Sequence, residues 1–497
     1  MRLLLKREIM KTLNLMKDMQ KVIEERWQIE EKSVLFEWFA QLQEAAMEIG
    51  QTVEEQDEPH VSLISGLEKY CEIVYRLGEA VINRNDAAGL WNNCNKKLLE
   101  IWQYAEQLDV KIKVAFLPYK YSMWDCMESI WKAACEDKNC DCQVIPVPYY
   151  DREQDGSLGK FRYEGDFFPE ETGIMDYQSY DLEAEQPDIV YIHNPYDEYN
   201  KVTCIAPAFF MEKIKKCGAV LVYVPYYLSG YCLKFDNMAS SCRTKGAFCS
   251  DYIILQSEKL KAAYEHCGIT GEKLIVTGSP KIDKMCELRE KGRKEKDEWR
   301  QMTDGKKVLL LNSGLSTFLN QEDWLGHVDG IVEQVLSDED MVLIWRPHPL
   351  LAQTIRSLKA EYLEEYEKIC QKVETAENGI LDLSEDYMDA VAASDGMISD
   401  YSSLVLQYTF SGKPVLLLEG CRKYRENEVF CDYFSNYFVS DGVEVIDFIK
   451  MIKNEADDNQ EERIMFAEKS VANGDGTCGL KTHKAIMKII ENRENQE

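Results

Sequence analysis

From residue 111 onward, short apolar runs alternate with segments of helical periodicity. The first series of runs is "KIKVAFLPY", "CQVIPVPYY", "DIVYIHNPY", "AVLVYVPYY", "DYIILQS" and "KLIVTGSP", with an acidic, aromatic loop after the second run. A charged linker, "ELREKGRKEKDEWRQMTDGK", leads to a second series: "KVLLLNSG", "MVLIWRPHP", "NGILDLS", "DGMISDYSS" and "KPVLLLEG". Strands that alternate with helices at this spacing predict βαβ units and parallel sheets. The sequence therefore predicts an α/β protein with two Rossmann-like domains.

Residues 1 to 108 follow a different pattern. They contain long stretches of helical periodicity, such as "MKDMQKVIEERW" and "LEKYCEIVYRLGEAVI", which predict three or four helices. We predict a helical N-terminal module at 1–108, a first Rossmann-like domain at 109–295, a second at 296–455 and a helical C-terminal tail at 456–497. Two Rossmann-like domains that face a cleft form the glycosyltransferase-B architecture, whose ligands bind at the carboxyl ends of the strands.

Composition narrows the classes of function. The formal net charge of -30 argues against broad nucleic-acid binding, so no nucleic-acid partner is expected. No run of about 18 apolar residues is present, so a transmembrane helix is not expected. The start, "MRLLLKREIMKTLNLMK", lacks the features of a secretory signal; it reads either as a basic amphipathic helix on an anionic membrane surface or as an ordinary packed helix. The expected location is cytoplasmic, with or without peripheral attachment to the inner face of the cell membrane.

The cysteines also bear on the location. The chain has 17 of them, an odd number, and no secretory signal, which is typical of reduced cytosolic thiols rather than a disulfide framework. The group "CEDKNCDC" (Cys135, Cys140 and Cys142) resembles half of a metal site. It lacks a second CxxC pair or a nearby pair of histidines, so no metal site is expected.

Two turns at strand ends of the second half carry the strongest signals for chemistry. In "WRPHP", two prolines stiffen the backbone around His348, and Arg346 stands beside it. In "SDYSS", a helix that begins at Ser402 or Ser403 would present unpaired N–H groups and two hydroxyls to an anion. The alternative is an ordinary helix cap made by Asp400 or Ser402. Capping needs only one of these side chains, so the surplus favours a phosphate site.

Two weaker strand-end turns belong to the same predicted cleft. In "VTGSPKIDK", Gly278 and Ser279 allow a ligand to approach closely, and Lys281 supplies a positive charge. In "LLLNSGLST", small polar residues that include Ser313 open the second half. Neither a Walker motif nor a dinucleotide fingerprint is present, so an NTPase and a dinucleotide oxidoreductase are not supported. Together the turns predict a diphosphate-binding cleft with one well-placed histidine.

The motifs "TGSPKID", "RPHP" and "SDYSSLVLQYTFSGKPVLLL", in this order, resemble those of the CDP-glycerol glycerophosphotransferase family, the teichoic-acid polymerases and primases. The resemblance implies transfer of glycerol phosphate, or a related polyol phosphate, from a CDP-activated donor to a hydroxyl of a polymer or lipid-linked acceptor. It implies no cofactor, because the donor is a substrate. It also implies that His348 contacts or protonates the donor diphosphate, that Arg346 helps to position it, and that Ser402 and Ser403 hold phosphate oxygens.

The sequence departs from the family pattern in two places. Members usually carry a Trp-His-Gly-Thr-Pro-like loop in the first half, whose histidine is a candidate base, whereas this chain has Tyr226, Tyr227 and Ser229 there. The nearest substitute is His193. Members commonly have an aspartate soon after the serine pair, where this chain has Gln407. Two alternatives therefore stay open: a nucleotide-sugar-dependent glycosyltransferase of the same fold, and a non-catalytic member that binds a nucleotide or polymer.

Overall fold

The computed structural model describes residues 1, 3–55, 60–153, 155–229, 242–292, 296–400, 402–418 and 444–494. The chain forms two compact units. The first contains Met1–Lys113, Asp137–Asp141 and Arg493–Glu497, and the second contains Val114–Glu136 and Cys142–Asn492. The cysteines that the structure describes are thiols rather than disulfides.

The first unit is a bundle of four helices, which confirms the predicted helical region. Each helix packs against two of the others. Its core comes from apolar residues spaced three and four apart, for example Ile9, Leu13 and Met16. This apolar face of the first helix is buried inside the bundle, which favours the packed-helix interpretation over a membrane-surface helix. The bounds are α1 (Leu3–Arg26), α2 (Lys32–Glu54), α3 (Val61–Ile82) and α4 (Ala88–Glu106).

Among the described residues, no helix combines the length and apolar character needed to span a bilayer.

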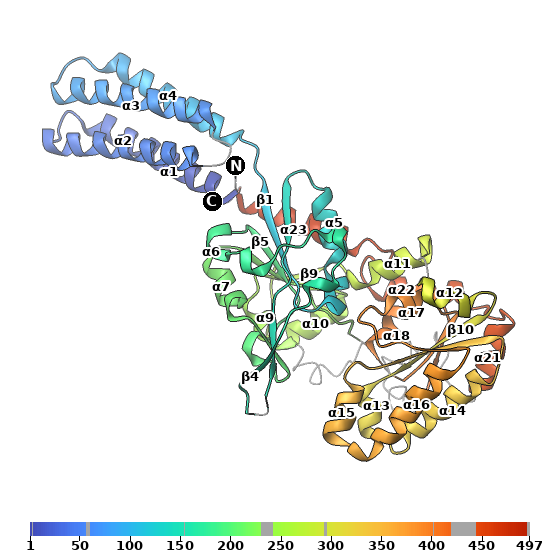
Figure 1. Ribbon diagram of the computed structural model, residues 1–497. Coiled ribbons are helices and arrows are strands. Elements are labelled where there is room, and N and C mark those ends of the chain that lie inside the picture. The colour runs from blue at the N-terminus through green and yellow to red at the C-terminus, as the bar shows by residue number, and fades with distance from the viewer. Residues whose placement is uncertain are drawn as a thin grey trace. The chain divides into compact units, whose positions relative to one another are not determined.

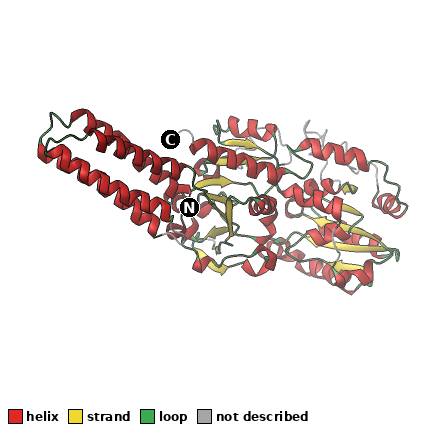
Figure 2. Ribbon diagram, turned by 90° about the horizontal axis from the view of Figure 1, so that it is seen from above, coloured by secondary structure: helices red, strands yellow, loops and turns green. Residues whose placement is uncertain are grey.

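The second unit contains two sheets with helices on their faces, as the α/β pattern predicts (Figures 1 and 2). The first sheet has the strand order β2-β1-β5-β7-β8-β9. Its strands are β1 (Ile112–Leu117), β2 (Cys140–Val144), β5 (Ile189–Ile192), β7 (Val220–Tyr223), β8 (Tyr252–Leu255) and β9 (Leu274–Val276). Its helices are α5 (Glu128–Glu136), α6 (Leu182–Glu185), α7 (Met211–Lys216), α9 (Lys245–Cys249) and α10 (Glu258–His266).

The second sheet has the strand order β12-β11-β10-β13-β14, with parallel pairing throughout. Most strand residues are buried on both faces, as expected for a parallel sheet covered by helices. Its strands are β10 (Lys307–Ser313), β11 (Met341–Pro347), β12 (Gly379–Leu381), β13 (Gly396–Ser399) and β14 (Val415–Leu417). Its helices are α13 (Leu315–Asn320), α14 (Trp324–Leu336), α15 (Leu351–Leu358), α16 (Leu363–Thr375), α17 (Met388–Ala393), α18 (Ser403–Tyr408) and α21 (Val445–Lys453).

A small antiparallel sheet occupies part of the region that we expected to be a loop. It has the order β4-β3-β6, with β3 (Tyr149–Arg152), β4 (Leu158–Arg162) and β6 (Thr203–Ile205). The run "CQVIPVPYY" was predicted as one strand, but it divides between β2 and β3, which belong to different sheets. Pro146 and Pro148 explain the division, because proline cannot donate a hydrogen bond to a sheet ladder.

Among the described residues, the segments that join the two sheets are mainly helical, where we expected a charged linker. Helix α11 (Lys281–Lys291) buries Ile282 and Met285 in the core under the second sheet, and α12 (Asp297–Thr303) follows it. Helix α22 (Gln460–Ser470) places Ala467 in the same core. Helix α23 (Cys478–Glu494) returns to the first sheet, where the hydroxyls of Thr482 and Thr277 are 2.8 Å apart.

Candidate active site

The side chains at the carboxyl edge of the second sheet are organised by one buried amide. The strand order reverses between β10 and β13, and a crevice for ligands opens at such a reversal in a parallel sheet. Asn312 on β10 lies in register with Ser399 on β13. Its Nδ2 donates to Ser399 Oγ at 2.8 Å and to Ser402 Oγ at 3.0 Å. Asn312 therefore joins the ends of both strands that flank the crevice.

Asp400 serves the neighbouring turn rather than its own helix. Its carboxylate is fully buried, and both oxygens accept the backbone N–H of Gly314 at 2.9 Å. Gly314 is required there, since a Cβ atom would lie 2.7 Å from an Asp400 oxygen. Burial raises the pKa of Asp400 to about 6. Asp400 thus fixes the start of α13, whereas the sequence had suggested a cap for α18.

Ser402 and Ser403 stand at the start of α18. Ser402 is the residue before the first helical turn, it makes no side-chain cap, and its hydroxyl accepts from Asn312. Ser403 is the first helical residue and is exposed. Val405 N–H donates to Ser402 O at 3.2 Å, and the N–H groups of Ser403 and Leu404 precede this first bond of the helix, which suits this position to an anion. The structure places both serines after the carboxyl end of β13, next to the end of β10.

His348 follows β11 at the same edge of the sheet. Its backbone N–H donates to Ser313 O at 2.9 Å, and its Nδ1 accepts the N–H of Leu350 at 3.1 Å. The side chain is exposed to solvent at one side, and desolvation by the surrounding protein atoms lowers the pKa of the imidazole. With Nδ1 occupied as an acceptor, the neutral ring carries its proton on Nε2, which is free to donate to a phosphate oxygen. The structure favours a neutral hydrogen-bond donor over the protonated histidine that the sequence suggested.

The side chains of Ser313 and Arg346, at the ends of β10 and β11, are hydrogen-bonded inside the protein. Ser313 is buried, and its hydroxyl accepts the indole N–H of Trp345 at 3.0 Å. Arg346 is also buried; it donates to Asp382 Oδ2 at 2.5 Å and to Ser384 O at 2.7 Å. Its guanidinium is therefore engaged in holding the turn after β12. The structure does not direct it to a ligand, in contrast to the positioning role that the resemblance implied.

The "GSPK" turn of the first half is used for packing. Gly278 has φ +98°, and a Cβ atom there would lie 2.0 Å from Ala472 O, so its conformation serves the approach of the chain before α23. Ser279 is buried beside it. Lys281 is buried too, and its Nζ donates to Asp125 Oδ1 at 2.5 Å. Lys281 is thus a paired lysine inside the protein rather than the mobile charge that we expected.

His193 fills the reversal point of the first sheet, between β1 and β5. It is fully buried; its Nε2 accepts the N–H of Tyr119 at 2.9 Å, and its Nδ1 lies 3.3 Å from Met123 O. Burial lowers its pKa to about 3. Since both ring nitrogens are engaged inside the protein, the structure does not place His193 to accept a proton from an incoming hydroxyl.

The tyrosines that stand where the family has its histidine loop are not bases at neutral pH. Tyr226 is half-buried and packs edge-on against Tyr227, with ring centroids 5.6 Å apart. Burial raises the pKa of both phenols, so they remain protonated donors. Ser229 is held by two backbone hydrogen bonds to the Gln256 side chain, at 2.7 and 3.0 Å. Segment 230–241, which continues this loop, lies outside the described residues.

Comparison with known proteins decides the family. Residues 240–488, half of the chain, match the family described as CDP-glycerol:poly(glycerophosphate) glycerophosphotransferase. The chain belongs to this family. A comparison with curated protein sequences finds no match.

Solved structures with the fold of this glycerophosphotransferase-family chain are distant in sequence. A UDP-N-acetylglucosamine 2-epimerase of Listeria monocytogenes is 16% identical, with a TM-score of 0.50 over 77% of this chain and 98% of that one. A variant of the wall teichoic acid polymerase TagF is 14% identical, with a TM-score of 0.48 over 86% of this chain and 99% of that one. The first likeness supports the two-domain α/β fold and says nothing about substrate.

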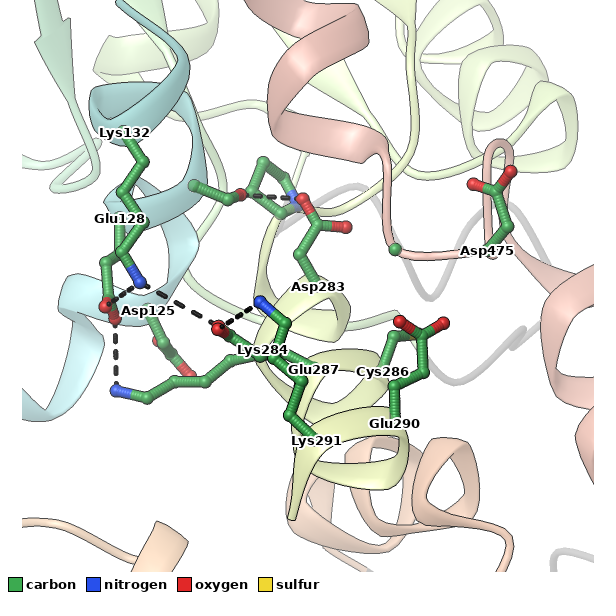
Figure 3. A pocket seen from close by; sticks show the side chains of 13 residues that line it. Asp125, Glu128, Lys132, Asp283, Lys284, Cys286, Glu287, Glu290, Lys291 and Asp475 are labelled. Carbon is green, nitrogen blue, oxygen red and sulfur yellow. Dashed lines mark hydrogen bonds and ion pairs between the residues drawn. The ribbon is translucent and has the colours of Figure 1, made fainter. Parts of the chain in front are cut away.

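A pocket of about 260 Å³ in this family member lies beside α11, away from the histidine and serine turns (Figure 3). Its lysines are matched by carboxylates: Lys284 Nζ lies 3.1 Å from Glu128, Lys132 Nζ 2.9 Å from Glu128, and Lys291 Nζ 3.1 Å from Glu287. Because these ammonium groups already have counter-ions, the pocket suits a diphosphate poorly.

Sequence reasoning missed the roles of three polar residues of this chain. Asn312 was noted only as part of a polar turn, and its role appears once β10 and β13 are neighbours. Lys120 follows β1, and its ammonium lies over the rings of Tyr119 and Tyr149 at 5.8 and 5.2 Å. A lysine at a strand end was an available signal for it. Asp125 had no sequence signal, because its partners come from distant segments.

Proposed function

We propose that this chain transfers glycerol phosphate, or a related polyol phosphate, from a CDP-activated donor to a hydroxyl of a teichoic-acid-like cell-wall or surface polymer. One observation carries the proposal. In a chain of the glycerophosphotransferase family, His348 and the start of α18 lie at the carboxyl ends of strands on either side of β10, where His348 N–H donates to Ser313 O and Asn312 donates to Ser402. This edge offers several hydrogen-bond donors to one anion.

The arrangement suits departure of CMP. The acceptor hydroxyl attacks the phosphorus of the polyol phosphate, the bond from phosphorus to the bridging oxygen breaks, and negative charge grows on the phosphate that leaves with CMP. Nε2–H of His348, the hydroxyl of Ser403 and the first N–H groups of α18 would donate to that charge. Because these donors are fixed in place before the reaction, little reorganisation is needed when the charge develops.

A base for the acceptor hydroxyl is less well supported than the donor site. His193 is buried, and the phenols of Tyr226 and Tyr227 are protonated, so none of these residues is placed to accept the proton of the attacking hydroxyl. This observation favours a second candidate function, a non-catalytic member that binds a nucleotide or polymer. A nucleotide-sugar-dependent transferase of the same fold is the remaining alternative.

A nucleotide screen followed by a transfer assay tests the proposal. Thermal stability of the full chain is measured with CDP, CDP-glycerol, CMP, UDP and a UDP-sugar, since a ligand that binds the folded state raises it. Release of CMP from CDP-glycerol is then measured with polyol and lipid-linked acceptors. CDP-specific stabilisation with CMP release supports the proposal. Release of UDP from a UDP-sugar alone supports the glycosyltransferase, and CDP binding without turnover supports the non-catalytic member.

A further inference from the structure

Asp125 is a buried carboxylate with partners in three separate segments. It lies in the 3-10 helix Tyr121–Cys126, directly after β1 of the first sheet. Its Oδ1 accepts from Lys281 of α11 at 2.5 Å, while its Oδ2 accepts from the phenol of Tyr387 and from Gln407 Nε2, the latter at 3.4 Å. Tyr387 and Gln407 both belong to the second half. One carboxylate therefore joins the first half, the connecting helix and the second half.

The two second-half partners lie in the elements that build the proposed donor site. Gln407 is in α18, the helix that begins with Ser403. Tyr387 follows the turn after β12, whose Ser384 is held by Arg346 at 2.7 Å. A displacement of Asp125 would therefore also displace α18, the helix of the proposed phosphate site, and the turn after β12.

The connecting helix is tied to the first half at the same place. In α11, Asp283 accepts the hydroxyl of Ser129 at 2.7 Å, and Lys284 pairs with Glu128 at 3.1 Å; Figure 3 shows both side chains of α11 beside α5. Asp283 also accepts the N–H of Gly479 at 2.7 Å, at the start of α23. The start of α11 is thus bonded to the first half while the same helix packs in the core of the second half, and Tyr387 and Gln407 add direct contacts between Asp125 and that half.

The hydrogen bonds of the Asp125 cluster have fixed donors and acceptors, and breaking one of them costs free energy. A buried carboxylate is stabilised by a cation and hydrogen-bond donors around it, and loss of one partner leaves a buried charge less compensated. Burial and the nearby Asp125 charge raise the pKa of Tyr387 well above its ordinary value, so the phenol is always the donor. The phenol of Tyr387 therefore stays protonated over the neutral range.

We propose that Asp125 is a positioning residue that fixes the donor-binding half against the acceptor-binding half through Tyr387 and Gln407. The kinetic consequence rests on the proposed function. Donor binding needs only the second half, whereas transfer needs the phosphorus and the acceptor hydroxyl at the correct separation. The cluster should therefore govern the rate of transfer more than the affinity for the donor.

Tyr387→Phe is the sharpest test, because it removes one hydroxyl and keeps the Asp125–Lys281 pair. Tyr70→Phe is the matched control: its hydroxyl is buried in the helical bundle and donates to Gln20 at 2.8 Å. For Tyr387→Phe we expect kcat for CMP release to fall about tenfold while the Kd for CDP-glycerol stays within about twofold. Asp125→Asn should give the same split with a larger loss of kcat.

A second readout does not depend on the substrate. Small-angle X-ray scattering of the full chain should give a larger radius of gyration for Tyr387→Phe than for the wild type, and an unchanged one for Tyr70→Phe. An unchanged radius together with wild-type kcat would overturn the inference. A wild type that neither binds CDP-glycerol nor releases CMP would sink the proposed function instead, while scattering would still decide the role of Asp125.

Discussion

Both carboxylate oxygens of Asp400 lie 2.9 Å from the backbone nitrogen of Gly314, across the crevice between β13 and β10. This contact ties the turn that carries the serine pair to the turn that opens the second half. Its cost is the burial of a carboxylate that has no cation among its hydrogen-bond partners in the described part of the chain.

Asp400→Asn should change how stability depends on pH. The pKa of Asp400 is about 6 in the folded chain and 3.8 ordinarily, so the folded state binds more protons between these values, and the Asp400 contribution falls as pH rises from about 4 to 6. A shift of about two units corresponds to roughly 3 kcal/mol. Urea unfolding of wild type and Asp400→Asn at pH 4, 5, 6 and 7 measures the difference. Parallel stability curves for the two proteins would contradict the assignment.

His193 should change the pH dependence of stability in the opposite direction to Asp400. Its pKa is about 3 in the folded chain against 6.5 ordinarily, so the unfolded state binds more protons, and stability falls as pH drops from about 6.5 toward 3. His193→Asn should lose this slope, which amounts to up to roughly 5 kcal/mol. The measurement is unfolding across that range. If His193→Asn also abolished an acidic limb of the transfer rate without loss of stability, His193 would be a base after all.

His348→Ala should lower the rate of CMP release by about a hundredfold or more, because a donor to the leaving phosphate is lost. His348→Gln should retain part of the rate, because its amide can donate in place of Nε2–H. Since the structure favours the neutral imidazole, the wild-type rate should not fall between pH 6.5 and 8 as a protonated histidine would require. His327→Ala, at an exposed position on α14, is the control. A steep alkaline loss centred near pH 6.5 would restore the protonated form.

Arg346→Met should destabilise the chain by about 3–5 kcal/mol, because it leaves Asp382 buried without its cation. The free energy of unfolding by urea measures this. We expect the Kd for CDP-glycerol of the remaining folded protein to change little, since the guanidinium faces Asp382 and Ser384. A large loss of affinity with normal stability would return Arg346 to the donor site.

The sequence predicted the fold well because the strands of parallel sheets are short, apolar and bounded by turns. Every strand expected in the second half is present, and "WRPHP" and "SDYSS" lie at carboxyl ends of their strands. The sequence could not show which charged side chains are paired with other groups inside the protein. Arg346, Lys281 and His193 look reactive in the sequence, and each is buried against partners far away in the chain. The small sheet was missed because β3 is mostly half-buried and β4 mostly exposed, and neither contains an apolar run like those of the parallel strands.

Helix α11 and the return of the chain into α23 give the second unit two crossings between its halves. The crossings touch: Cys286 of α11 donates its thiol hydrogen to Gly474 O at 3.5 Å, and a Cβ atom at Gly476 would lie 2.9 Å from Cys286. Two adjacent crossings form a hinge, which permits the two halves to rotate about one axis and resists sliding and twisting of one half against the other. A bulky residue at position 476 would push the two crossings apart and so restrict that rotation.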